Sequence, residues 1–222
     1  MREIVFDTET TGFKPDEGHR LIEIGCVELF NTLPTGQTRQ WYVNPERDVP
    51  DDAVRVHGLT ADFLEKYPVF GNVVGEILEF LGDAPLVAHN APFDMSFLNA
   101  ELKRCGHRPL KNKVTDTVQL ARKKFPGAPA SLDALCKRFG IDNSSRSYHG
   151  ALLDASLLAE VYLELSGGRQ TALVLDSAGE ATAVRLSGTR KPRPARPHTP
   201  SPEERAAHTE LLKKLKNPVW LN

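Results

Sequence analysis

Ile4-Val-Phe-Asp-Thr-Glu-Thr-Thr-Gly12, close to the start of the chain, places two carboxylates directly behind an apolar run. Such a run is typical of a buried strand. Side chains two positions apart on a strand face the same side, so Asp7 and Glu9 are expected to point into one pocket. Residues 10 to 12 then predict a tight, flexible turn where backbone can approach a ligand closely. Taken alone, such a pair of acids is usually no more than a polar strand end.

Two later segments carry acids in comparable settings. Asp94 ends the stretch His89-Asn-Ala-Pro-Phe-Asp94, directly after a second short apolar strand, and Asp154 lies early in a helical pattern from 151 to 165. The helix dipole favours an acid in the first turn whatever its function, so each acid taken singly has a structural explanation. His149 precedes that helix. Histidine suits general-base work on a water, although beside a glycine it can simply bond to backbone or solvent.

The four acids and the histidine together predict one catalytic centre. Cleavage of a phosphodiester uses two divalent cations about 3.5 to 4 Å apart, one activating water and one stabilising the leaving oxygen. Hard cations such as Mg²⁺ prefer oxygen ligands and keep several waters, so carboxylates around an open pocket suit them. Coincidence does not easily explain all three segments, and we interpret them as a two-metal nuclease site.

The motifs FDTETTG, VHGLT, HNAPFD, SLDALC and HGALLDA also carry a family resemblance. In this order and spacing they resemble the DEDDh family of 3′-to-5′ exonucleases, and within it the epsilon proofreading subunits of bacterial DNA polymerase III, over roughly residues 2 to 166. A sister group carries tyrosine four residues before the last aspartate, where this chain has Gly150. The resemblance implies that His149 takes the proton from the attacking water and that two metal ions, Mg²⁺ or Mn²⁺, are held by Asp7, Glu9, Asp94 and Asp154.

The resemblance further implies a group of residues around the terminal nucleotide of the substrate. Phe93 offers an apolar or stacking surface that tolerates any base, and the alternative is that it belongs to the core. The implied substrate-binding residues are Asp7, Glu9, Thr10, Thr11, Gly12, Asp52, His57, Asn90, Phe93 and Asp154.

Composition fits a soluble intracellular enzyme, with 40% hydrophobic and 26% charged residues among 222 and a formal net charge of -1. The length suffices for one well-buried domain and an appendage. The near-neutral charge argues against a broad basic face that grips duplex DNA, so we expect a partner to supply DNA affinity. Cys26, Cys105 and Cys136 indicate neither a disulfide framework nor a zinc site. No signal peptide or membrane span is evident, and we expect a cytoplasmic protein.

Hydrophobic periodicity predicts an α/β sheet covered by helices. The resemblance implies that this is the ribonuclease H-like fold, with a mixed five-stranded sheet. Strands are expected near residues 3–7, 21–30, 38–44, 85–89 and 112–115, and helices near 69–81, 93–105, 117–124, 131–139 and 151–165. We assign residues 1–168 to the exonuclease domain.

The character of the chain changes after this domain. Residues 189–202 hold five prolines and four basic residues with no acid, which is typical of a solvated linker. Ser201 is expected to cap a short helix through Lys216. We interpret residues 203–222 as a helix and tail that dock on the polymerase alpha subunit through Leu211, Leu212, Leu215 and Trp220. The alternative is a frayed tail, or one folded back on its own domain.

Between domain and linker lies Gln170-Thr-Ala-Leu-Val-Leu175, within a segment assigned to 169–188. It is similar to the sliding-clamp-binding peptide of epsilon subunits, with Gln170, Leu173 and Leu175 as its contacts. The same stretch also fits a small hairpin that turns at Gly179, and the two interpretations are compatible. Whether a small accessory subunit binds the nuclease domain stays open.

Three functions therefore remain. The first is a proofreading DNA exonuclease that acts on single-stranded or frayed 3′ ends and is held in a replicase by its tail. The second is a stand-alone enzyme of the same superfamily that trims RNA from its 3′ end, and the third is a non-catalytic scaffold. The tail favours the first over the second, because a compact RNA trimmer has no evident need of a linker and docking helix. The complete set of acids and histidine weakens the third.

Overall fold

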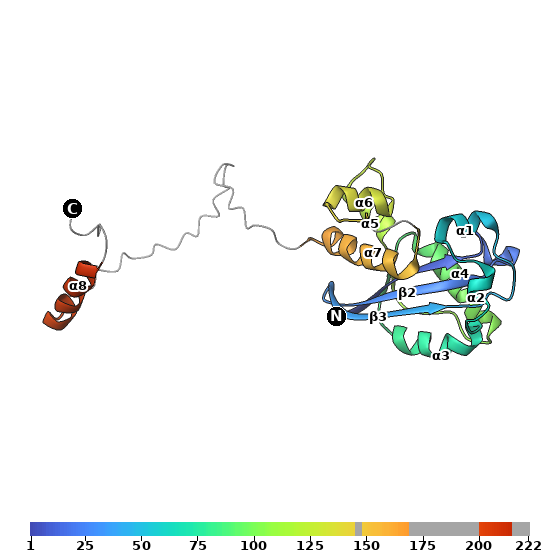
Figure 1. Cartoon of the computed structure of the whole chain (residues 1–222), viewed down its shortest axis with the longest axis horizontal. Helices are drawn as coiled ribbons and strands as arrows, with labels where there is room; N and C mark the ends of the chain where they lie inside the picture. The colour runs from blue at the N-terminus through green and yellow to red at the C-terminus, as the bar shows by residue number, and fades with distance from the viewer. Residues whose placement is uncertain (145–147, 169–199, 215–222) are drawn as a thin grey trace, which may run out of the picture. The chain divides into compact units, whose positions relative to one another are not determined.

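The central sheet is visible in a computed structural model that describes residues 1–144, 148–168 and 200–214 (Figure 1). The chain divides into two compact units, residues 1–174 and 175–222. The first unit contains a sheet with the order β3-β2-β1-β4-β5, formed by β1 (Arg2–Thr10), β2 (Leu21–Phe30), β3 (Leu33–Tyr42), β4 (Leu86–Ala88) and β5 (Val114–Asp116). The pairs β1–β2 and β2–β3 are antiparallel, whereas β1–β4 and β4–β5 are parallel. The predicted mixed five-stranded sheet is confirmed.

Helices cover both faces of this sheet (Figure 1). α3 (Phe70–Leu81) and α4 (Ala91–Arg104) share one apolar core with Ile4 and Phe6 of β1. Val5 points to the opposite face, where the core is shared with α5 (Thr117–Lys124), α6 (Leu132–Phe139) and α7 (Ala151–Leu165). This division follows from the two-residue period of a strand, which sends successive side chains of β1 to opposite faces.

β1 and β4 are parallel neighbours, so their carboxyl ends meet at one edge of the sheet. In open α/β sheets ligands bind at such an edge. β4 leads into α4 through Asn90, which has a φ of +65°. Asparagine tolerates this left-handed conformation better than most residues, and it allows an abrupt turn from strand to helix. β1 therefore ends at this edge, and α4 begins there.

Two predicted strands differ most from the structure in their bounds, whereas β4 and β5 differ by one or two residues at each end from the expected 85–89 and 112–115. β1 continues to Thr10, beyond the expected end at residue 7, and β3 spans Leu33–Tyr42 instead of 38–44. β3 is an edge strand whose first eight residues are exposed, so it lacks the apolar alternation on which the prediction depended. A tight turn with φ values of +51° at Asn31 and +66° at Thr32 pairs it with β2.

Three short helical elements were not expected from the sequence. They are η1 (Pro15–Glu17), α1 (Asp51–His57) and α2 (Ala61–Leu64). α1 ends at Gly58, which has a φ of +75° and donates its amide to the Val54 carbonyl at 2.7 Å. Thr60 caps α2 by accepting a hydrogen bond from the Phe63 amide at 3.2 Å. These helices are too short for hydrophobic periodicity to reveal them.

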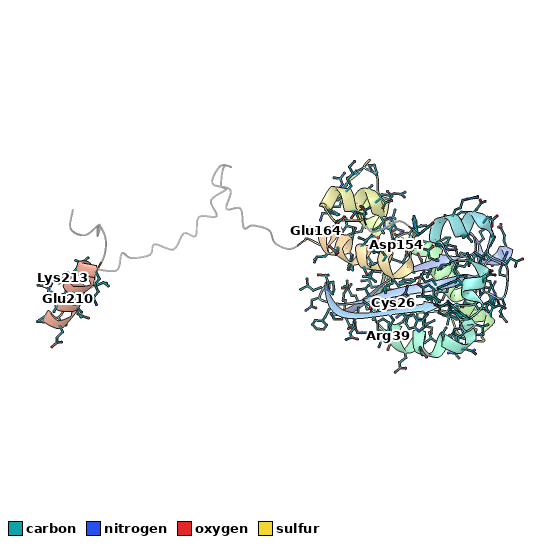
Figure 2. All side chains as sticks on the ribbon, in the orientation of Figure 1. Cys26, Arg39, Asp154, Glu164, Glu210 and Lys213 are labelled. Atoms are coloured by element: carbon teal, nitrogen blue, oxygen red, sulfur yellow. The ribbon has the colours of Figure 1, made fainter. Side chains whose placement is uncertain are left out.

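The second unit is described by its helix α8 (Pro202–Lys214), on which Figure 2 labels Glu210 and Lys213. The Ser201 hydroxyl accepts from the Glu204 amide at 3.1 Å, and the Ser201 amide donates to the Glu204 carboxylate at 2.8 Å. The predicted cap at Ser201 is thereby confirmed as a reciprocal capping box. Leu211 is 55% exposed on this helix. The segment predicted to bind the clamp, 169–188, the predicted linker residues 189–199, and Leu215 and Trp220 lie outside the described residues.

Within the described part of the chain, helices lack the length and apolar character needed to cross a membrane.

Candidate active site

One hollow of about 330 Å³ is lined by all four predicted metal-binding acids and the predicted base. Asp7 and Glu9 come from the carboxyl end of β1, and Asp94 from the first turn of α4. Asp154 lies in the first turn of α7, and His149 lies just before that helix. Residues separated by as much as 147 positions in the chain thus meet at the edge where β1 and β4 end.

Three of the four predicted metal-binding acids are largely withdrawn from water, and Asp7 is partly buried. Glu9 is 8% exposed, and Asp94 and Asp154 are each 3% exposed, whereas the His149 side chain is 49% exposed. Gathering buried carboxylates raises the free energy of their ionised forms through desolvation and mutual repulsion. A divalent cation relieves both effects, so the arrangement is typical of a cation site.

A subset of these groups has the spacing of metal ligands. Glu9, His149 and Asp154 each offer one ligand atom, and these atoms all lie within 4.8 Å of one another. His149 Nδ1 lies 3.4 Å from Asp154 Oδ2. Carboxylate oxygens on an open hollow suit a hard divalent cation that keeps some of its waters. The residues present therefore fit a divalent metal.

Asp94 is held by a neighbour that sequence reasoning missed. The Thr8 hydroxyl donates to Asp94 Oδ1 at 2.7 Å. Thr8 alternates with Asp7 and Glu9 along β1, so its side chain faces α4 while theirs face α7. Burial raises the pKa of Asp94 to about 7, although the hydrogen bond from Thr8 opposes this effect. The strand period could have identified Thr8 as a residue that faces away from the acid pair.

The raised pKa of Asp94 predicts that Asp94→Asn stabilises the metal-free protein at alkaline pH. Its pKa of about 7 in the fold exceeds the ordinary value of 3.8, so the unfolded chain releases this proton first. Wild-type stability therefore falls as pH rises between these values. Asparagine keeps an acceptor for Thr8 but carries no charge. Urea unfolding in a chelator should show the advantage of the variant growing by about 2.5 kcal/mol from pH 5 to pH 8.

A pH-independent difference between the two proteins would contradict this assignment of the titration to Asp94. Thr8→Val, which removes the hydroxyl donor, serves as the matched variant. Thr8→Val should be less stable than wild type, and the difference should be largest at pH 8, where Asp94 is ionised and the hydrogen bond to its charged form is strongest.

A second hollow, of about 350 Å³, lies beside the first and shares Thr8, Glu9 and Phe93 with it. Gly12 lies on its wall, and a Cβ atom there would be 2.3 Å from the ring of His19, so any other residue would have to displace that ring. The predicted nucleotide contacts that line this hollow are Glu9, Thr10, Thr11, Gly12, Asp52, His57 and Phe93.

The threonines of this wall use their hydroxyls to shape the loop itself. The Thr10 hydroxyl donates to the Gly12 carbonyl at 2.6 Å, and the Thr11 hydroxyl accepts from the Arg20 amide at 2.9 Å. Thr11 is fully buried. The loop is thus fixed by internal hydrogen bonds, which makes the hollow largely preformed.

His57 contributes a buried donor to the second hollow. It is 6% exposed, and its Nδ1 accepts from the Leu59 amide at 3.0 Å, so the neutral ring carries its proton on Nε2. Burial lowers the pKa of His57 and keeps the ring neutral at pH 7. The Thr10 backbone acts in the opposite direction on this pKa, but Nε2 makes no hydrogen bond of ordinary geometry to any described residue. A buried donor of this kind is typical of a position completed by a ligand.

Comparison with known proteins supports this reading of the geometry. Residues 4–162, the greater part of the chain, match the family described as exonuclease. The chain belongs to the exonuclease family. A relative from Rickettsia typhi named DNA polymerase III subunit epsilon is 45% identical over 97% of this chain and 97% of its own length. Another of that name from Rickettsia felis is 52% identical over 78% of this chain and 77% of its own.

The fold of this exonuclease also has solved counterparts. Exonuclease X in complex with 5′ overhanging duplex DNA matches with a TM-score of 0.56 at 23% identity, covering 73% of this chain and 89% of the other. At this identity the likeness concerns the fold alone. The ribonuclease H-like fold that the sequence motifs implied is confirmed.

Aromatic and apolar side chains complete the second hollow of the exonuclease. Phe93 packs on Phe97 with ring centroids 5.1 Å apart, so it belongs to the core, and it also lines both hollows. Its predicted contact with a base stays a prediction. Phe13 and Val56 line the second hollow and are 84% and 47% exposed. Sequence reasoning missed both, because the exposure of Phe13 depends on the path of its loop and because α1, which carries Val56, was not expected.

Four other residues of the exonuclease line the first hollow and were also missed. They are His89, which directly follows β4, and Ser131, Leu132 and Asp133 at the start of α6. The motifs HNAPFD and SLDALC had marked these two segments but assigned these four residues no role.

Two predicted substrate contacts lie farther from the centre. Asp52, on α1, lines the second hollow and bonds to Arg55. Asn90 is exposed and is not among the residues that line either hollow. Its backbone amide donates to Asp116 Oδ1 at 3.1 Å. In this exonuclease Asn90 is thus seen to shape the start of α4, and its predicted contact with a nucleotide stays a prediction.

Proposed function

We propose that this chain is the 3′-to-5′ exonuclease that proofreads for a bacterial replicative DNA polymerase. Its reaction would be hydrolysis of the phosphodiester that joins a mispaired 3′-terminal nucleotide to the strand. The observation that carries the proposal is the meeting of Asp7, Glu9, Asp94, His149 and Asp154 in one hollow beside a nucleotide-sized one. The near full-length similarity to proteins named DNA polymerase III subunit epsilon supports the choice of DNA over RNA.

We assign the metal site to two divalent ions, Mg²⁺ or Mn²⁺, held by Asp7, Glu9, Asp94 and Asp154. When bound, such ions stabilise the charge that develops on the phosphodiester. The chain itself supplies the base. His149 is half exposed and lies beside Asp154, which can orient the imidazole and stabilise its protonated form while the ring takes a proton from water.

The second hollow would hold the terminal nucleotide. His57 offers a buried Nε2–H donor there, and Phe93 and Phe13 offer ring surfaces to a base. Stacking on an aromatic ring does not depend on base identity, which suits an enzyme that must remove any nucleotide. Single-stranded or frayed 3′ ends fit such a site, because a terminal base must leave its partner to enter it.

We further propose that the tail connects the exonuclease domain, residues 1–168, to its partners in the cytoplasmic replisome. Residues 189–202 would act as the linker and residues 203–222 would dock on the polymerase alpha subunit. Gln170, Leu173 and Leu175, within 169–188, would bind the sliding clamp. The exposure of Leu211 on α8 supports the docking step, because this apolar side chain has no cover within its own helix.

A pull-down from cell extract tests the proposal. Full-length protein is expected to recover a polymerase large subunit, whereas protein truncated before Thr189 is not. Both should digest single-stranded DNA from its 3′ end at similar rates with Mg²⁺, because the truncation leaves both hollows intact. Recovery of no polymerase, together with a clear preference for RNA oligomers, would assign the same centre to RNA trimming.

Point variants on α8 sharpen this test. Leu211→Glu combined with Leu212→Glu should abolish recovery of the polymerase. The control is Glu210→Ala combined with Lys213→Ala, which removes an exposed ion pair with an N–O distance of 2.7 Å on the same helix. Such a pair contributes little to stability, so the control should recover the polymerase like wild type.

A further inference from the structure

Glu23 is a buried acid for which the proposed reaction has no direct use. It lies on β2, is 2% exposed and pairs directly across the antiparallel ladder with Glu9. Like charges in this relation repel each other. Glu23 also shares a face of β2 with Val27, which packs in the core formed with α7. Glu9 and Glu23 are thus buried side by side beneath α7. Glu23 therefore needs hydrogen-bond donors of its own.

Those donors come from α7 and from β3. Gly150, which precedes α7, offers no side-chain cap, and the first amides of a helix have no partners within the helix. Burial raises the pKa of Glu23, while the Gln40 side chain and the backbone amides of Ala151 and Leu152 lower it. Gln40 Nε2 donates to Glu23 Oε1 at 2.7 Å. The Glu23 carboxylate therefore serves as the cap that α7 lacks locally.

The backbone of β2 lies directly against this end of α7. Gly25 faces the same side as Glu23, and a Cβ atom on it would be 2.2 Å from backbone atoms of Ala151 and Leu152. The first turn of α7 is thus seated on two successive inward-facing positions of β2. Any substitution that loosens this contact between β2 and the first turn of α7 would move the backbone that carries Asp154.

The opposite part of α7 is held by a different buried acid. The Tyr162 hydroxyl donates to Glu3 Oε1 at 2.9 Å. Figure 2 labels Asp154 and Glu164 toward opposite ends of the helix. Glu3 and Glu23 therefore hold the two ends of α7 on the sheet. Only the end held by Glu23 adjoins His149 and Asp154.

We propose that Glu23 is a positioning residue, whose carboxylate fixes the first turn of α7 so that Asp154 and His149 stay within reach of Glu9. The inference rests on the proposed function, because it assigns Glu23 a part in the same metal centre. Loss of the carboxylate releases the turn, and the spacing of the metal ligands relaxes before the fold is lost. Removal of such supporting groups typically weakens metal affinity or activity about 10- to 100-fold.

The test compares full-length Glu23→Ala, Glu23→Gln and Glu3→Ala. Mn²⁺ binding is measured by calorimetry without substrate, and kcat and KM are measured on a single-stranded DNA. Glu23→Ala is expected to weaken Mn²⁺ binding and lower kcat about 10- to 100-fold, with KM little changed. Glu23→Gln, which keeps an acceptor for the α7 amides, should recover most of both. Glu3→Ala should lose stability yet bind Mn²⁺ within about twofold of wild type, because its end of α7 carries no metal ligand.

Each other result overturns the inference in a recognisable way. Wild-type Mn²⁺ binding by Glu23→Ala would remove any positioning role, and equal damage in Glu23→Gln would assign the effect to charge alone. An equal loss of Mn²⁺ binding and kcat in Glu3→Ala would show that the effect comes from general loosening of α7. If Glu23→Ala fails to fold, Gln40→Ala, at an exposed position, must still weaken Mn²⁺ binding in the same direction. Calorimetry without DNA keeps this result separate from failure of the proposed function, which digestion by the wild-type protein tests.

Discussion

Asp7→Ala is expected to abolish exonuclease activity, with a loss of about three orders of magnitude or more in kcat. Asp7 lies at the carboxyl end of β1 and faces the same side as Glu9, so its removal takes one oxygen donor from the centre of the hollow. Metal ions contribute several kcal/mol to stabilising the charge of such a transition state, and each 1.36 kcal/mol is about a tenfold change in rate. Mn²⁺ binding should weaken in parallel.

The measurement combines single-turnover digestion of a 3′-labelled DNA with calorimetric Mn²⁺ binding. Asp83→Ala is the matched control, because Asp83 is an exposed acid just before β4, at the edge of the sheet opposite the hollow. It should leave both activity and Mn²⁺ binding unchanged. Normal activity of Asp7→Ala would overturn the assignment of the catalytic centre.

His149→Ala is expected to lower kcat about 10²- to 10⁴-fold while Mn²⁺ binding is retained. The geometry allows His149 to be either a general base or a metal ligand. Its Nδ1 lies 3.4 Å from Asp154 Oδ2, and it belongs to the group of residues that fits a metal. A general base can be removed without loss of the metal, whereas a ligand cannot. The four acids are sufficient oxygen donors, so we expect the first outcome.

The same two measurements decide this case. His107→Ala removes an exposed histidine just after α4 and should behave as wild type. Weakened Mn²⁺ binding in His149→Ala would make His149 a ligand, and another base would then be needed. Full activity in the variant would exclude both roles.

Much of the fold followed from patterns that are local in the sequence. The helix bounds expected at 117–124 and 151–165 match α5 and α7, because α5 carries an apolar face and α7 is apolar around most of its surface. β3 was misplaced because its first eight residues are exposed, so this edge strand has no such regularity. α1 and α2 were missed because one or two helical turns give too short a pattern.

The residues of the candidate site also divide into those that the sequence predicted and those that it did not. Asp7 and Glu9 were expected on one face because two-residue spacing on a strand allows nothing else, and the structure places both in the first hollow. His57 was expected near a nucleotide through family motifs, and it lines the second hollow. Phe13 lines it too, yet nothing in the residues around it indicates that its ring is 84% exposed.

The sequence by itself determined which side chains are candidates for the chemistry, because strand alternation and the spacing of motifs depend on neighbours along the chain. Only the tertiary structure decided which groups hold those side chains in place. Thr8 meets Asp94 across 86 positions, and Glu23 meets the first amides of α7 across more than a hundred. Such pairs arise when helices pack on the two faces of one sheet. The positions that meet are set by the register and depth of that packing, which leave no periodic mark in either segment.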